Sequence, residues 1–266
     1  MPDAPEDLLA VAVEVVRGAA DLARDLRGHG VSGVATKSTD TDVVTAADKA
    51  TERYVRDALR RRRPDDTVLG EESGESTGTG AVRWIVDPID GTVNYLYGLP
   101  QYAVSLAAEV DGEVVAGVVR NAANGEEWTA VRDGGAYRDG RRLTGSTVTD
   151  LGQTLVATGF GYAAARRAHQ AQVVAKLLPM VRDIRRFGAA SLDLCFAAEG
   201  RVDAYYEKGL SLWDHAAGGL VAAEAGLRVT GLYGGPPGPD LIIAAPPGIQ
   251  PALHDALAAF DAAGGP

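Results

Sequence analysis

Residues 84–94 read Trp-Ile-Val-Asp-Pro-Ile-Asp-Gly-Thr-Val-Asn. The apolar run at 84–86 predicts the buried end of a β-strand, and the proline and glycine that follow predict a sharp break after it. Asp87 and Asp90 lie beside this break, three residues apart. Carboxylates held so close repel each other unless a proton or a cation lies between them. The stretch therefore predicts a cation site, and an ordinary acidic turn is the simpler alternative.

A hard divalent cation would remove the repulsion between the two aspartates. Mg²⁺ takes oxygen ligands and commonly binds through one or two carboxylates together with substrate phosphates. Gly91 and Thr92 stand at the predicted start of the next helix, where backbone N–H groups bind anions well. The stretch thus favours a site that holds Mg²⁺ and a phosphate group together.

Three more acidic segments lie elsewhere in the chain. Glu71 and Glu72 follow a strand-like run, and because neighbouring strand residues point to opposite faces, only one of them can face a common site. Asp48 stands three residues after Thr45, which is the spacing of a helix capping box. Asp214 precedes a predicted helix, so its simplest role is that of an N-cap. The residues alone leave open whether these carboxylates meet the aspartates of the central stretch.

The composition limits the classes of function. A chain of 266 residues allows one large domain or two closely packed ones, and its formal net charge of −10 disfavours nucleic acid or an anionic membrane as a general partner. Cys195 is the only cysteine, which excludes an intrachain disulfide and a cysteine-based zinc site, and we expect it in the core. No stretch is long enough to span a membrane, and acidic residues at 3, 6 and 7 oppose a secretory signal. We expect a cytoplasmic protein.

The pattern of apolar residues predicts two halves of different character. Helices are expected at 8–26 and 45–63, and Asp-Gly turns between 103 and 140 predict an antiparallel meander sheet covered by these helices on one face. From about residue 146, strands and helices alternate instead. The strands are predicted at 155–158, 184–187, 202–206 and 241–244, and the helices at 163–181, 189–198, 215–225 and 251–262. We therefore predict an α+β half at 1–145 and a smaller α/β half at 146–266.

Three motifs resemble one known family. Residues 87–94 match the first signature of the inositol monophosphatase family, and residues 213–219, continuing through 224–226, match the second. Residues 70–73 match the remaining metal-ligand segment of that family. The motifs occur in the family's order and span most of the chain, which as a whole is most similar to bacterial inositol-1-monophosphatases.

The resemblance implies a fold and an activity. Members of this family are layered αβαβα sandwiches of the sugar-phosphatase type. By resemblance we expect an enzyme that hydrolyses inositol 1-phosphate by direct in-line attack of a metal-bound water. It would use two to three Mg²⁺ ions, be inhibited by Li⁺ and form a homodimer.

The resemblance also implies roles for matching residues. Glu71, Asp87 and the Ile89 carbonyl would hold the first Mg²⁺, and Asp87, Asp90 and Asp214 the second. Thr92 and Asp48 would orient the attacking water. The residues expected to contact substrate are Gly91, Thr92, Asp90, Asp214, Glu207 and the free backbone N–H of Ala190, with Lys37 near the phosphate.

Other activities compete with this prediction. Histidinol phosphate, fructose 1,6-bisphosphate or a nucleotide 3′-phosphate could be the substrate of the same site. A phosphoenzyme mechanism of the haloacid-dehalogenase type places its two aspartates two residues apart, whereas Asp87 and Asp90 are three apart. The chain could instead be a regulatory partner of the transcription machinery, although its complete set of acidic ligands argues for retained catalysis.

Overall fold

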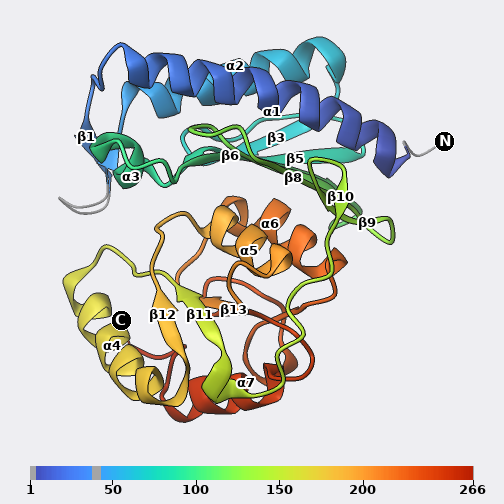
Figure 1. Ribbon diagram of the computed structural model, residues 1–266. Coiled ribbons are helices and arrows are strands. Elements are labelled where there is room, and N and C mark those ends of the chain that lie inside the picture. Colours follow the sequence, from blue (N-terminus) through green and yellow to red (C-terminus); the bar gives the residue numbers. More distant parts are fainter. Residues whose placement is uncertain (1–3, 38–42, 266) are drawn as a thin grey trace.

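The computed structural model describes residues 4–37 and 43–265, which form five layers (Figure 1). Two helices cover an eight-stranded sheet, two more form the middle layer, and a five-stranded sheet follows with helices on its outer side. This is the αβαβα sandwich that the sequence led us to expect. The predicted fold class is confirmed.

The eight-stranded sheet has the order β10-β9-β8-β7-β6-β5-β3-β4. Its pairs are antiparallel except the parallel pair of β3 and β5. Its strands are β3 (Thr67–Gly70), β4 (Gly74–Glu75), β5 (Val82–Asp90), β6 (Ala103–Val110), β7 (Glu113–Asn121), β8 (Glu127–Val131), β9 (Gly135–Arg138) and β10 (Arg141–Arg142). A separate two-stranded sheet pairs β1 (Ala35–Thr36) with β2 (Val43–Val44).

The predicted meander is confirmed, and its turns show why it forms. Asp111 and Gly112 join β6 to β7 with φ angles of 52° and 81°. Asp139 and Gly140 join β9 to β10 with φ angles of 48° and 79°. Two-residue hairpins of this kind need positive φ at both positions, which aspartate and glycine tolerate better than other residues.

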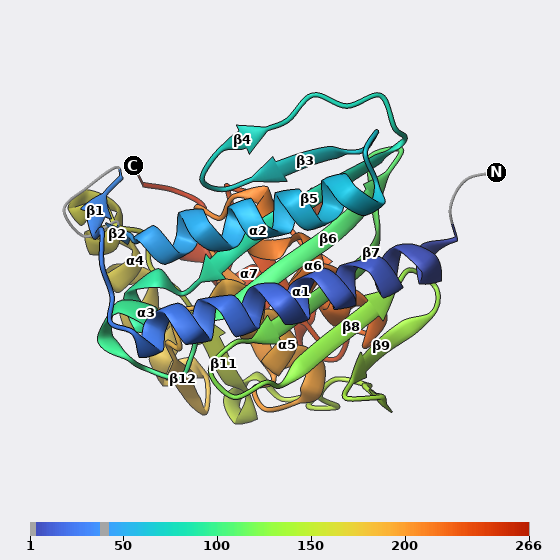
Figure 2. The ribbon, with the colours of Figure 1, turned by 90° about the horizontal axis from the view of Figure 1, so that it is seen from above.

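Helices α1 (Pro5–Gly28) and α2 (Ala46–Arg62) lie on one face of the eight-stranded sheet (Figures 1 and 2). Both were predicted from the sequence, within a few residues of these bounds. Leu8 and Val15 of α1 and Val55 of α2 are buried in a core that includes Trp84 of β5. This packing fixes the strand that carries the central acidic stretch.

Helices α5 (Ala190–Glu199) and α6 (Leu212–Glu224) form the middle layer. Every residue of α5 except Glu199 is buried, including the polar Ser191 and Asp193, because this mainly apolar helix is packed between two sheets. Cys195 lies in this buried part, so its predicted core position is confirmed. A Cβ atom at Gly117 of β7 would lie 3.0 Å from Cα of Ala217, which shows how closely α6 approaches the first sheet.

The five-stranded sheet has the order β12-β11-β13-β15-β14, with β11 parallel to both of its neighbours. Its strands are β11 (Leu155–Thr158), β12 (Asp183–Arg185), β13 (Ala204–Glu207), β14 (Arg228–Thr230) and β15 (Ile242–Ala245). Helices α4 (Ala164–Leu177) and α7 (Gln250–Ala259) pack on its outer face. Short 3₁₀ turns occupy η1 (Leu151–Gln153), η2 (Leu178–Met180) and η3 (Leu232–Gly234).

Three sequence predictions for the second half need correction. The helix expected at 163–181 ends at Leu177, because Pro179 cannot continue an α-helix and lies in η2. The strand expected at 184–187 is β12, which ends at Arg185. Strand β14, which has three residues, was not predicted.

The first sheet ends with Arg142 and the second begins with Leu155. The division into domains at 145/146 stays a prediction. No helix in the described part of the chain combines the length and apolar character needed to cross a bilayer.

Candidate active site

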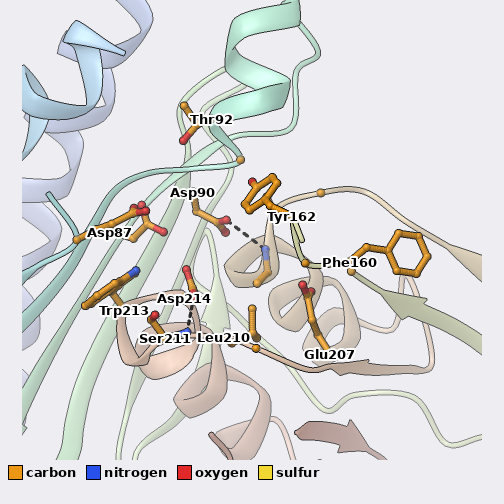
Figure 3. A pocket seen from close by; sticks show the side chains of 18 of the residues that line it. Asp87, Asp90, Thr92, Phe160, Tyr162, Glu207, Leu210, Ser211, Trp213 and Asp214 are labelled. Carbon is orange, nitrogen blue, oxygen red and sulfur yellow. Dashed lines mark hydrogen bonds between the residues drawn. The ribbon is translucent and has the colours of Figure 1, made fainter. Parts of the chain in front are cut away.

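A cavity of about 470 Å³ lies where the two halves meet (Figure 3). Residues from β5, α3 (Thr92–Tyr97), α5, α6 and the end of β13 line it. The predicted site residues that line it are Lys37, Glu71, Asp87, Ile89, Asp90, Gly91, Thr92, Ala190, Glu207 and Asp214. Asp48 is the one predicted site residue outside the lining, and it contacts the cavity through Thr92.

Asp87 and Asp90 lie in an irregular end of β5. The strand does not stop at Val86 as predicted but continues to Asp90, and its register against β6 shifts between the two aspartates. Such a bulge can re-aim side chains, and here both carboxylates line the cavity. The break falls at Gly91, whose φ is 89° and whose Cβ, if present, would lie 2.8 Å from the Gln101 carbonyl oxygen.

Asp48 uses its two oxygens for two different partners. Oδ2 accepts hydrogen bonds from the backbone N–H and the hydroxyl of Thr45, at 2.8 and 2.5 Å, which completes the predicted capping box of α2. Oδ1 lies 3.1 Å from Oγ1 of Thr92. That hydroxyl is equally close to the Ile89 carbonyl oxygen and can donate its single proton to only one of the two. Asp48 is thus a capping residue and a partner of Thr92 at once.

Lys37 bridges the two neighbouring glutamates. Its Nζ donates to Glu71 Oε1 at 2.8 Å and to Glu72 Oε1 at 2.5 Å. The two glutamates lie in the turn after β3 and not in the strand, so strand alternation does not separate them as predicted, although only Glu71 lines the cavity. Burial opposes the charge of Lys37, but the two carboxylates outweigh this effect and raise its pKa above the ordinary value. The remainder of the loop, residues 38–42, lies outside the described residues.

Asp90 is tied to the start of α5. Its Oδ1 accepts the Ala190 N–H at 3.2 Å, and its Oδ2 accepts the N–H and hydroxyl of Ser191 at 2.7 and 2.5 Å. The prediction that the Ala190 N–H is free for substrate is therefore wrong, because Asp90 already occupies it. These bonds connect the first half of the chain to the second.

Asp214 lies in the first turn of α6 and not at its N-cap. Ser211 is the N-cap, and the Asp214 carboxylate accepts the Ser211 N–H at 2.6 Å. The N-cap interpretation is wrong because α6 begins at Leu212, before the predicted start at 215. This capping bond holds the Asp214 side chain at the cavity (Figure 3).

The facing carboxylates destabilise one another. Burial, followed by repulsion from Glu71 and Asp90, raises the pKa of Asp87 well above its ordinary value. The pKa of Asp214 is also well above its ordinary value, through burial and then repulsion from Asp90 and Glu71. A positive charge placed in the cavity at neutral pH would therefore stabilise the ionised carboxylates and lower their repulsion.

The donor set fits a hard cation. Among the residues that the structure describes, no three acidic, histidine or cysteine side chains already converge as a metal site. Glu71 faces Lys37 and Asp90 faces α5, so these side chains would have to share or exchange partners to bind a metal. Carboxylate and carbonyl oxygens are nevertheless the ligands that Mg²⁺ prefers, and a divalent cation would relieve the repulsion.

Glu207 ends β13 and lines the second-half side of the cavity. Tyr205 donates its hydroxyl to Oε2 of Glu207 at 2.6 Å. Burial raises the pKa of Glu207 to about 7, although this hydrogen bond and the charge of Arg186 oppose the shift. A Cβ at Gly159 would overlap the Glu207 carboxylate, so the glycine makes room for it.

The sequence analysis missed several cavity residues in the second half. Figure 3 shows Phe160, Tyr162 and Trp213 around the cavity, and Arg166 and Arg186 also line it. Residues 159–163 read Gly-Phe-Gly-Tyr-Ala directly after β11, and two glycines alternating with aromatics could have indicated a cavity wall. No motif indicated the two arginines.

A five-layered sandwich with a carboxylate-lined cavity between its halves is the architecture of the sugar phosphatases. The sequence model of the inositol monophosphatase family matches residues 4–260. The chain is 45% identical to the inositol-1-monophosphatase of Mycobacterium leprae, covering 97% of this chain and 95% of that one. It is 41% identical to the Nus factor SuhB of Escherichia coli K12, covering 86% of each.

A solved structure agrees with the sequence comparisons. The extragenic suppressor protein suhB of Bartonella henselae superposes with a TM-score of 0.89 at 36% identity, over 94% of this chain and 98% of that one. The chain therefore belongs to the inositol monophosphatase family.

Proposed function

We propose that this protein is a Mg²⁺-dependent phosphomonoesterase that hydrolyses inositol 1-phosphate to inositol and phosphate. The observation that carries the proposal is that Glu71, Asp87, Asp90 and Asp214 all line one cavity, which Thr92 also lines. The mycobacterial relative described above supports the choice of substrate. Cytoplasmic location, a homodimer and inhibition by Li⁺ belong to the same proposal.

The carboxylates would hold two to three Mg²⁺ ions. Glu71, Asp87 and the Ile89 carbonyl are the proposed ligands of one ion, and Asp87, Asp90 and Asp214 those of another. Bound Mg²⁺ would supply the positive charge that draws the phosphate in and lowers the pKa of the attacking water.

Side chains and backbone groups of the chain would orient the attacking water and bind the substrate. Asp48 accepts the Thr92 hydroxyl proton in a hydrogen bond, which leaves the Thr92 oxygen able to accept a hydrogen bond from the attacking water and so to orient it toward phosphorus. The backbone N–H groups of Gly91 and Thr92 are the proposed phosphate contacts. Asp90, Asp214 and Glu207 are the proposed contacts of the inositol hydroxyls, whereas Lys37 stays paired with Glu71 near the phosphate.

The test is phosphate release from inositol 1-phosphate, histidinol phosphate and fructose 1,6-bisphosphate, each with Mg²⁺ and with EDTA. We expect activity that requires Mg²⁺, is highest on inositol 1-phosphate and falls by at least about 100-fold in Asp90→Asn. A higher kcat/KM on another ester would overturn the substrate. Activity that persists in EDTA would overturn the metal dependence.

A second candidate function is suggested by the relative that is named a Nus factor. We infer that a regulatory role in transcription would not need the acidic ligands. Rescue of a deletion strain by an inactive Asp87→Asn variant, equal to rescue by the wild type, would favour this role. Rescue by the wild type alone would favour catalysis.

A further inference from the structure

Helix α2 carries a second buried carboxylate one turn after Asp48. Glu52 lies four residues further along the helix, which places both side chains on the same helix face. The Glu52 side chain is only 1% exposed, and it does not line the cavity. The roles proposed above use Asp48 and not Glu52.

Glu52 binds the turn that contains the proposed metal ligand Glu71. This turn comprises residues 71–73 and joins β3 to β4. Oε2 of Glu52 accepts the backbone N–H of Glu72 at 2.7 Å, and Oε1 accepts the backbone N–H of Ser73 at 3.1 Å. One carboxylate thus holds two consecutive amide groups of the turn.

The residue before Glu71 also lies against Glu52. A Cβ atom at Gly70 would lie 2.5 Å from Cδ of Glu52, so any side chain at this position would displace the carboxylate. The main chain therefore lies close to Glu52 immediately before and immediately after Glu71.

Arg56 connects Glu52 to the two strands that flank the turn. Its Nε donates to Oε1 of Glu52 at 2.8 Å. Its other two guanidinium nitrogens donate to the carbonyl oxygens of Val68, at 3.3 Å, and of Gly74. Val68 belongs to β3 and Gly74 to β4. The pair of Glu52 and Arg56 is therefore bonded to both strands and to the turn between them.

Stability alone is a weak reason for this buried ion pair, because both ions lose their hydration when they enter the core. Its hydrogen bonds do fix the position of the turn. Mg²⁺ demands near-ideal octahedral geometry from its ligands, and hydrogen bonds from surrounding groups commonly orient ligating carboxylates.

We propose that Glu52 is a positioning residue, which holds the backbone of residues 70–73 so that Glu71 is oriented for Mg²⁺ binding. Asp48 and Glu52, one turn apart on α2, then fix the Thr92 hydroxyl and the Glu71 turn relative to each other. This inference rests on the proposed function, since it takes Glu71 as a metal ligand.

The test is calorimetric titration of Mg²⁺ into metal-free wild type and Glu52→Gln. The amide nitrogen of glutamine cannot accept a hydrogen bond, so the variant keeps only one acceptor oxygen for the turn. We expect its dissociation constant for Mg²⁺ to rise by about 10-fold or more, as when other groups that orient metal ligands are lost. Saturating Mg²⁺ should restore kcat on inositol 1-phosphate. A dissociation constant equal to that of wild type would overturn the positioning role.

Glu224→Gln is the matched control. Glu224 of α6 accepts the backbone N–H groups of Asp133 and Gly135, each at 2.9 Å, and so binds the hairpin of β8 and β9 as Glu52 binds that of β3 and β4. No residue of the β8–β9 hairpin lines the cavity. We expect the control to leave the Mg²⁺ dissociation constant unchanged. An equal rise in both variants would overturn a specific role of Glu52.

Gly70→Ala tests the same contact from the side of the turn and decides the inference if Glu52→Gln does not fold. Glu52 stays in the chain, and the new Cβ would force the carboxylate and the turn apart. We expect Mg²⁺ to bind more weakly here as well, and unchanged binding would overturn the inference.

Failure of the proposed function would be visible separately. If wild type binds no Mg²⁺, the proposed function fails and the role of Glu52 fails with it. If wild type binds Mg²⁺ and hydrolyses inositol 1-phosphate, but Glu52→Gln binds Mg²⁺ equally well, only the role of Glu52 fails.

Discussion

Asp48 shows how one side chain links folding to the proposed chemistry. One of its oxygens caps α2 through Thr45, and the other contacts the hydroxyl of Thr92. Both contacts require an acceptor. An asparagine has one acceptor oxygen, so it can satisfy only one of them.

Asp48→Asn should therefore lower kcat on inositol 1-phosphate by about 100-fold or more, because Thr92 loses the partner that orients it. It should also cost about 1 kcal/mol of folding stability through the weakened cap. Steady-state kinetics and urea denaturation measure the two effects. Thr45→Ala is the control, since it removes the cap and leaves the Thr92 contact. If both variants lose the same factor in kcat, the loss comes from the weakened helix cap and not from the orientation of Thr92.

At the scale of elements, the first turn of each middle helix faces the cavity. The amide groups of α5 bind Asp90, and the first turn of α6 carries Asp214. The position of α6 depends on its close approach to β7, where Gly117 leaves room for Ala217. A displacement of α6 would move Asp214 away from the other carboxylates.

Gly117→Ala should displace α6, because the new Cβ would lie 3.0 Å from the backbone of Ala217. We expect a loss of about 1–3 kcal/mol in the free energy of unfolding, as for other overpacked cores, together with a lower affinity for Mg²⁺. Thermal melts and Mg²⁺ titration of activity measure these changes. Gly219→Ala lies on the same helix with open space around its new Cβ, and it should be neutral or stabilising by up to about 1 kcal/mol. A Gly117→Ala protein as stable as wild type would contradict this account.

At the scale of the whole molecule, the proposed metal site joins the two halves. Glu71 follows β3 and Asp87 lies in β5 of the first sheet, whereas Asp214 comes from α6 in the middle layer. Without a cation, the raised pKa of Asp87 means that the folded state holds a proton that the unfolded state releases. The contribution of Asp87 to the stability of the metal-free protein is therefore fully present below the ordinary pKa of an aspartate and is lost as pH rises through the folded-state pKa.

Asp87→Asn should accordingly stabilise the metal-free protein at pH 8, because it removes one buried charge from the cluster. With millimolar Mg²⁺ we expect wild type to be the more stable of the two proteins, because it gains binding energy from the cation that the variant lacks. Melting temperatures in EDTA and in Mg²⁺ provide the measurement. If the melting temperature of the wild type does not change when Mg²⁺ is added, the proposed metal site is contradicted.

The sequence by itself determined most of the elements, because local chemistry fixes them. Asp-Gly pairs impose the hairpins, apolar spacing imposes α1 and α2, and residues 87–94 indicate the acidic site. The meander followed from these features, whereas the sandwich was implied by the resemblance to the inositol monophosphatase family. Element ends were less predictable where single residues decide them, as at Pro179 and Ser211.

The tertiary structure decided which hydrogen-bonding groups of the site already have a partner within the protein and which side chains face one another across the cavity. Distances between residues far apart in sequence carry this information, and no local pattern encodes them. Only the packing of α5 on β5 gives the Ala190 N–H to Asp90, and only the fold brings Arg186 into the cavity with Glu207. The sequence thus indicated the acidic residues of the cavity, whereas only the fold brings residues 159–163, 186–188 and 207–209 of the second half together around it.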